Sequence, residues 1–201
     1  MSNKAPRALF VVVCLALGAC RLPYAGGAKP VAVTTIDDHW HRAAPTPVVR
    51  QQDRTDCGVA ALAMVAGAWG QSWSLAEMRQ SLPANKEGVR LGALRDYART
   101  KGLVAYAVKG THDDLVFELS RHRPVLLGLV LPFAKDKALA HYEVAIAVDP
   151  RDGSVITQDP ATGKMMRRTR EVLDLEWKPS NYATLVVVGT TQASAALVTG
   201  R

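Results

Sequence analysis

The spacing of hydrophobic and polar residues predicts helices in the first part of the chain. Residues 57–69 are apolar on every side and rich in alanine, which predicts a helix that is buried all round. Thr55 or Asp56 could cap its start. Ser74 and Glu77 fit a capping box that opens a second helix. Two further helices are expected over residues 92–100 and 111–121, the last capped at its N-terminus by the Thr-His-Asp-Asp run.

Further along, the pattern changes from helical to extended. Short runs rich in β-branched residues and bounded by Gly, Pro or Asp predict strands over residues 103–108, 124–131, 142–148, 154–158 and 183–188. Helices followed by strands indicate an α+β fold, in which a helical lobe packs on a mostly antiparallel sheet.

Composition fits one globular domain with appendages. The chain has 201 residues, of which 48% are hydrophobic and 21% charged, so global disorder and collagen-like repeats are excluded. The formal net charge is +7, and only 6% of residues are aromatic. Because no basic run is interleaved with aromatic residues, no nucleic-acid partner is indicated, whereas an anionic membrane surface would attract the protein.

The N-terminal twenty residues have the character of a targeting segment. Lys4 and Arg7 precede the apolar run 8–19, which is shorter than the roughly 20 residues of a membrane-spanning helix and suits a signal peptide. The run ends in Leu-Gly-Ala-Cys at 17–20, which resembles the lipobox of bacterial lipoproteins. This resemblance implies removal of residues 1–19, acylation of Cys20 and, because Arg21 follows, an outer-membrane anchor facing the periplasm. A plain secretory signal or a short uncleaved anchor is the alternative.

Such processing changes the cysteine count. Cys14 would leave with the signal peptide and Cys20 would carry lipid, so Cys57 would be the only thiol left and no disulfide could form. A single thiol in an oxidising compartment is either buried and inert or retained for its reactivity.

The expected division of the chain follows from this composition. Residues 20–47 contain Gly-Gly and four prolines, which predicts a lipidated cysteine followed by a tether. His39 and His41 flank Trp40 in this tether, but no ligand cluster completes a metal site, so a docking loop is expected. The folded domain is expected over 48–189, with the basic run 164–170 as solvated surface, and a flexible tail over 190–201.

Cys57 is the candidate nucleophile. A cysteine in the first turn of a helix lies among outward-pointing N–H groups, which favour the thiolate. The alternative is a packed core thiol. Gln51 lies six residues upstream, where its amide could join the Cys57 N–H in binding the oxyanion of a tetrahedral intermediate. Gln52 competes for this role on sequence alone.

His141 and Asp159 are the candidate base and orienting acid. They lie nine residues before and nine residues after Pro150, so a hairpin centred there would place them opposite each other. A turn centred on Arg151 and Asp152 would instead separate them by up to about 10 Å. Taken singly, His141 could be an ordinary strand-end histidine and Asp159 a residue that starts a turn.

These residues carry a family resemblance. Residues 51–65 (QQDRTDCGVAALAMV), followed by His141-Tyr142 and Asp159-Pro160, resemble the bacteriocin-processing, double-glycine leader peptidases, a family of papain-like cysteine peptidases. The resemblance spans residues 48–188. It implies a papain-like fold with Cys57 as nucleophile, His141 as general acid and base, Asp159 as orienting acid, and Gln51 rather than Gln52 in the oxyanion hole. No metal or organic cofactor is implied.

Many members of that family are N-terminal domains of ABC exporters that face the cytosol and remove leaders ending in Gly-Gly. This sequence contains no Walker A motif and its N-terminal segment indicates export. It therefore resembles the stand-alone exported and lipoprotein relatives, whose substrates are less uniform, and double-glycine specificity is left open.

The resulting expectation is a lipid-anchored cysteine endopeptidase that cleaves an exported peptide or protein through a thioester acyl-enzyme. A secretion system or transporter is the expected partner. One alternative is a non-catalytic peptide-binding module that assists secretion or assembly. The other is a cell-wall peptide hydrolase, although those enzymes usually carry Asp-Cys-Ser-Gly where this chain has Asp-Cys-Gly-Val at 56–59.

Overall fold

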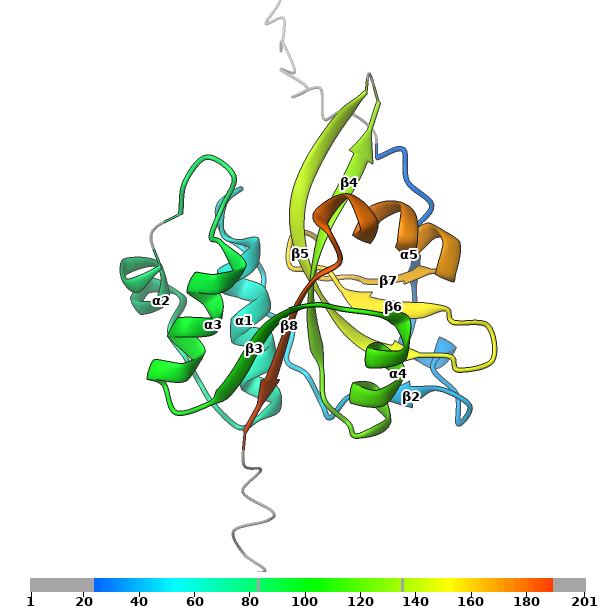
Figure 1. Ribbon diagram of the computed structural model, residues 1–201, viewed down its shortest axis with the longest axis horizontal. Helices are drawn as coiled ribbons and strands as arrows, with labels where there is room; N and C mark the ends of the chain where they lie inside the picture. Colours follow the sequence, from blue (N-terminus) through cyan, green and yellow to red (C-terminus); the bar gives the residue numbers. More distant parts are fainter. Residues whose placement is uncertain (1–23, 83, 135, 190–201) are drawn as a thin grey trace, which may run out of the picture.

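The computed structural model describes residues 24–82, 84–134 and 136–189 (Figure 1). The expected signal peptide 1–19, the lipid site Cys20 and the tail 190–201 lie outside these ranges. In chain order the elements are β1 (Lys29–Val31), η1 (Val33–Thr35), β2 (His41–Arg42), α1 (Cys57–Ala68), α2 (Leu75–Ser81), α3 (Leu91–Thr100), β3 (Val104–Lys109), α4 (His112–Ser120), β4 (Val125–Phe133), β5 (Lys137–Val148), β6 (Val155–Gln158), β7 (Met165–Arg168), α5 (Arg170–Trp177), η2 (Lys178–Ser180) and β8 (Ala183–Val188).

The strands form one antiparallel sheet in the order β1-β7-β6-β5-β4-β8-β3, and β2 pairs with β5. Helices α1, α2 and α3 lie together beside the end of the sheet that carries β3 and β8 (Figure 1). This arrangement confirms the predicted α+β class with a helical lobe on an antiparallel sheet.

Two hydrophobic clusters hold the layers together, because alternate residues of a strand point to opposite faces. Leu126, Val144 and Leu185 pack with α1, α2 and α3. Val125 and Ala145 belong to a second cluster with residues of α4 and α5. None of the helices in the described ranges combines the length and the apolar character of a bilayer-spanning segment.

Helix α1 is buried from Cys57 to Ala66, as its all-apolar sequence predicts. Its expected side-chain cap is absent: the carboxylate of Asp56 bonds to the Asp53 N–H and to Arg79 instead of the helix. Ser74 also makes no capping bond. At α4 the N-terminal cap is confirmed, because the Thr111 hydroxyl and the carboxylate of the third helical residue form a capping box.

The segment expected to be a tether packs against the sheet from residue 24 onward. Strand β1 pairs with β7, and its proline is tolerated because β1 is an edge strand. Trp40 is only 6% exposed and packs with Ala147 and Ile156. Burial of the Trp40 indole holds this segment against the sheet. The docking loop expected around Trp40 is therefore not available as an exposed loop.

Candidate active site

Cys57 is the first residue of α1 and is buried. The next residue, Gly58, allows the helix to approach β5, because a Cβ there would lie 3.0 Å from Cδ2 of Tyr142. The loop before Cys57 is fixed by the ion pair between Asp56 and Arg79, whose Oδ2 and Nη2 are 2.6 Å apart. The Asp-Cys-Gly sequence therefore places the thiol at a close contact between α1 and the strand that carries His141.

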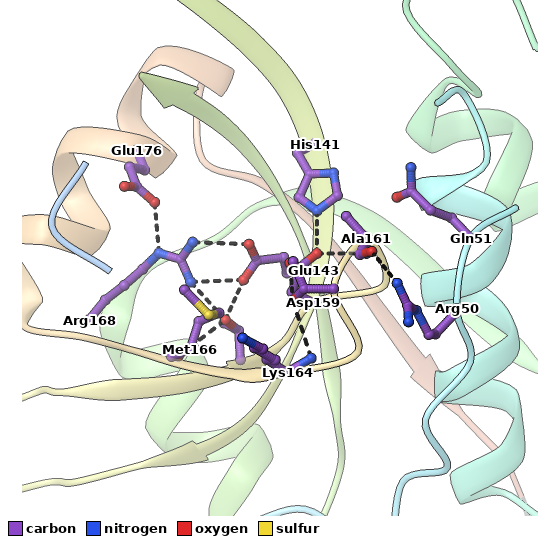
Figure 2. A network of polar contacts seen from close by, with 12 residues as sticks. Arg50, Gln51, His141, Glu143, Asp159, Ala161, Lys164, Met166, Arg168 and Glu176 are labelled. Atoms are coloured by element: carbon purple, nitrogen blue, oxygen red, sulfur yellow. Dashed lines mark hydrogen bonds and ion pairs between the residues drawn. The ribbon is translucent and has the colours of Figure 1, made fainter. Parts of the chain in front are cut away.

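His141 and Asp159 form a buried pair, in which Nε2 of the imidazole lies 2.7 Å from Oδ1 of the carboxylate (Figure 2). Asp159 is held for this contact by the turn that follows β6, because its Oδ1 also accepts from the Ala161 N–H and its Oδ2 accepts from the Thr162 hydroxyl. The structure thus brings together two residues that are 18 positions apart in the sequence.

The register behind this contact differs from the expected one. Val148 pairs with Val155 and Val144 with Gln158, so the hairpin centres near Arg151 and not on Pro150. A bulge between Ala145 and Ala147 absorbs one residue. If this pairing continued by one residue, Asp159 would lie opposite Glu143. The turn after β6 instead directs the Asp159 carboxylate toward His141.

The charges of the site favour a protonated imidazole. Burial lowers the pKa of His141, but hydrogen bonds to Asp159 and Cys57 and the charge of Glu143 outweigh it and raise the pKa to about 10. Burial likewise raises the pKa of Asp159, yet its hydrogen bond to His141 and the charge of that ring bring it below its usual value. Because Asp159 occupies Nε2, the opposite nitrogen is the one available to the Cys57 sulfur.

This arrangement predicts the pH dependence of thiol reactivity. At pH 7 iodoacetamide should alkylate Cys57 in the wild-type chain about 10- to 30-fold faster than in His141→Ala, because an unassisted thiol is only a few per cent thiolate there. The raised pKa keeps the imidazolium up to about pH 10, so the wild-type rate should change little between pH 7 and 9. The rate for His141→Ala should rise with pH. Mass spectrometry of the Cys57 peptide measures both.

His112→Ala is the matched control, since Nε2 of His112 also meets a carboxylate, Oδ1 of Asp174, at 3.1 Å but away from the thiol. It should retain the wild-type rates. Equal alkylation rates in wild type and His141→Ala across this pH range would contradict the assignment.

Gln51 lies beside His141 and lines the same pocket (Figure 2). Gln52 does not line that pocket. The Gln51 N–H donates to Pro160 O at 3.0 Å, which ties its loop to the Asp159 turn. Its Nε2 donates one hydrogen to Asp53 O, and the amide keeps a second hydrogen for another acceptor. Gln52 is exposed and accepts from Arg79. Of the two glutamines, the structure brings Gln51 to the candidate active site.

A buried ionic network next to His141 was not predicted from the sequence. Arg168 binds Glu143 through two nitrogens, at 2.8 and 3.0 Å, and Glu176 through Nε at 2.7 Å (Figure 2). The Tyr24 hydroxyl donates to Glu176. The run 164–170 therefore is not all solvated surface, because Arg168 is 1% exposed. The sequence did contain one indication of this network. Glu143 lies two positions after His141, so on a strand both side chains point to the same face, where a buried acid needs a cationic partner.

His141, Glu143 and Asp159 place possible metal ligands within 4.8 Å of one another. Their donor atoms are already engaged, because Asp159 bonds to Nε2 of His141 and both carboxylate oxygens of Glu143 bond to Arg168. The guanidinium charge at this position would repel a cation. The residues therefore suit an acid–base pair better than a metal centre.

Two pockets flank His141. One, of about 280 Å³, lies between the loop 85–90 and the strands β4 and β5. The other, of about 320 Å³, is lined by Gln51 and Asp159 as well as His141. Both pockets therefore adjoin the imidazole of His141.

Comparison with known proteins places this site in a family context. The Peptidase C39 family matches residues 45–187. The transport/processing ATP-binding protein ComA of Streptococcus pneumoniae is 31% identical over 131 residues, which are 63% of this chain and 17% of that protein. The chain thus spans less than a fifth of that relative.

Solved structures show the same architecture. The peptidase domain of Streptococcus ComA matches with a TM-score of 0.59 and 25% identity, over 73% of this chain and all of that domain. A double glycine motif protease from an AMS/PCAT transporter, solved with a leader peptide, matches with a TM-score of 0.57 and 20% identity, over 74% of this chain and 95% of that one. The predicted papain-like fold is confirmed.

Proposed function

The chain belongs to the peptidase C39 family of cysteine peptidases, and from this premise we propose that it is an exported, lipid-anchored endopeptidase. Its substrate is a peptide or protein that crosses the inner membrane, such as a leader-bearing secretion substrate. It works through a thioester acyl-enzyme. The observation that supports this proposal is the shared location of Cys57, His141, Asp159 and Gln51.

Acylation follows from the positions of these groups. The Cys57 thiolate attacks the scissile carbonyl carbon and forms the C–S bond, while the carbonyl electrons move to oxygen. The oxyanion accepts hydrogen bonds from the Cys57 N–H, which has no partner within the helix, and from Nε2 of Gln51. As the C–N bond breaks, His141 gives its proton to the departing amine.

Deacylation reverses these roles. The neutral His141, held by Asp159 at Nε2, takes a proton from water, and the hydroxide oxygen attacks the thioester carbon. The second tetrahedral intermediate collapses with cleavage of the C–S bond. This releases the carboxylic acid product and restores the thiolate with its imidazolium.

The oxyanion role of Gln51 predicts a kinetic loss. Gln51→Ala should lower kcat by about 10²- to 10³-fold with little change in KM, since the lost hydrogen bond forms in the transition state. Gln52→Ala is the matched control from the next position and should remain near wild type. Cleavage of candidate exported substrates, followed by mass spectrometry of the products, measures both. A larger defect in Gln52→Ala would overturn the assignment.

Export and anchoring are supported by the N-terminal sequence. Basic residues, an apolar run too short to span a bilayer and the Leu-Gly-Ala-Cys motif precede the folded domain. Because Arg21 follows the motif, we place the anchor in the outer membrane with the domain facing the periplasm. A protease in that position meets substrates during or after secretion, so a transporter or secretion system is the partner that this proposal requires.

Lipidation is tested directly by its chemistry. Mass spectrometry should find acyl chains on Cys20 as the mature N-terminal residue, and Cys20→Ala should move the protein from the membrane fraction to the soluble fraction. Cys14→Ala is the matched control, since Cys14 would leave with the signal peptide, and it should not change fractionation. An unmodified Cys20 in membrane-free protein would remove the anchor from the proposal.

A further inference from the structure

The pocket on the Gln51 side of His141 has features of a side-chain subsite. It is lined by His141, Asp159 and Gln51, so it opens directly onto the candidate catalytic groups. Its volume of about 320 Å³ is at the lower end of the range of ligand pockets, and suits one large side chain. Because His141 and Gln51 both act at the scissile bond in the proposed mechanism, a substrate side chain next to that bond would lie beside this pocket.

The walls of this pocket are apolar. Leu131, Phe133 and Leu139 come from the long β4–β5 hairpin, and Met166 comes from β7. Leu139 is 39% exposed, and Phe133 and Met166 are partly exposed. Apolar side chains that converge on a concave surface favour an apolar occupant, because burial of that occupant removes apolar area from water.

The charged groups at the pocket select against a cationic occupant. Glu143 and Arg168 line its floor, but their side chains are 2% and 1% exposed and are paired with each other. They therefore offer no unpaired charge to a ligand. Arg54 is exposed at the same pocket and disfavours a lysine or arginine side chain by repulsion.

One wall lies outside the region that the C39 family matches. Tyr24 precedes residue 45, where that match begins. Its ring packs edge-on against Phe133 with centroids 6.0 Å apart, and the adjacent Ala25 N–H donates to Pro132 O at 2.9 Å. Its hydroxyl donates to Glu176 and accepts from the Ala28 N–H at 3.0 Å. The N-terminal segment is thereby fixed as part of the pocket.

We infer that this pocket is a specificity subsite that takes a large, uncharged apolar side chain, such as leucine, methionine or phenylalanine, of a substrate residue adjoining the scissile bond. This inference rests on the proposed function. It specifies which class of side chain the proposed peptidase prefers in its substrate. It also gives the N-terminal segment, through Tyr24, a part in selecting the substrate. Tyr24, Phe133 and Leu139 are the residues that determine the preference.

Cys57 itself reports on the pocket without knowledge of the natural substrate. The full chain, purified in detergent, is treated with iodoacetamide or with N-benzyl iodoacetamide, and alkylation of the Cys57 peptide is followed by mass spectrometry. The quantity compared is the alkylation rate with the benzyl reagent divided by the rate with iodoacetamide. This rate ratio should be about tenfold higher for Cys57 than for glutathione, because the pocket binds the benzyl ring. Leu139→Asp should return this ratio to the glutathione value.

Leu175→Asp is the matched control, because Leu175 is a 74% exposed leucine on α5 that does not line the pocket, and it should keep the wild-type ratio. In a cleavage assay with a mixed peptide library, apolar residues should be enriched at one position adjoining the cleaved bond, and less so for Leu139→Asp. Fast reaction with iodoacetamide but no benzyl advantage would overturn the subsite alone. Slow reaction of Cys57 with both reagents would overturn the proposed function as well.

Discussion

Replacing Cys57 by alanine should lower peptide cleavage by about 10⁴-fold or more while the fold is retained. The mechanism gives the sulfur two tasks, attack on the carbonyl carbon and storage of the acyl group, and alanine can do neither. Because Cys57 opens an alanine-rich helix that is buried from Cys57 to Ala66, a smaller apolar side chain fits its position. Cleavage of candidate exported substrates, with turnover measured by mass spectrometry, gives the rate.

Two comparisons separate lost chemistry from lost structure. The circular dichroism spectrum of Cys57→Ala should match that of the wild type, because α1 keeps its buried face. Cys57→Ser should also be inactive to a similar degree, since a hydroxyl beside the same imidazolium is a far weaker nucleophile than a thiolate. Cleavage by Cys57→Ala at more than about one per cent of the wild-type rate would show that another group performs the reaction.

The sequence was sufficient for the parts of the site that depend on local pattern. An apolar run with a cysteine at its start predicts a buried helix and a thiol at its N-terminus, and α1 has both. The strand predicted over 142–148 is also present, but β5 begins earlier, at Lys137, so His141 lies within the strand and not before it. The capping box of α4 formed as its Thr-x-x-Asp spacing indicates.

Other features depend on contacts that local pattern does not encode. The turn of the hairpin lies between Arg151 and Asp152, and the bulge in β5 corrects this offset by only one residue, so Asp159 reaches His141 from a turn and not from the facing position. The caps expected at Asp56 and Ser74 are missing, since Asp56 finds a cationic partner in Arg79 instead. Such choices between equally plausible partners are decided by tertiary packing.

The N-terminal segment and the network around Arg168 illustrate the same point at long range. Prolines and glycines in 20–47 indicate irregular chain, but Trp40 and the edge strand β1 still find apolar or unpaired surface on the sheet. The basic run 164–170 looks solvated until Glu143 and Glu176, from other elements, surround one of its arginines. In both cases the burial depends on partners that are distant in the sequence, so local pattern alone does not predict it.

Arg168→Met should destabilise the fold by about 3–5 kcal/mol, the usual cost of leaving buried charges without their partner. Arg168 compensates two carboxylates, Glu143 and Glu176, and all three side chains are nearly inaccessible to water. Methionine has a similar length but cannot donate a hydrogen bond, so both carboxylates would remain buried without their cation. Urea unfolding curves, compared through the midpoint at constant slope, measure the loss.

The pair of Arg95 and Asp96 provides the control, because it is also an arginine within hydrogen-bond distance of a carboxylate, at 2.8 Å, but at the surface. Arg95→Met should leave the urea midpoint essentially unchanged, since water replaces a lost surface contact. Adding Glu143→Gln to Arg168→Met removes one of the stranded charges and should restore part of the midpoint. If the single Arg168→Met variant unfolds at the same urea concentration as the wild type, the network of Arg168 with Glu143 and Glu176 does not stabilise the fold. The rigidity of the strand that carries His141 must then come from other contacts in the sheet.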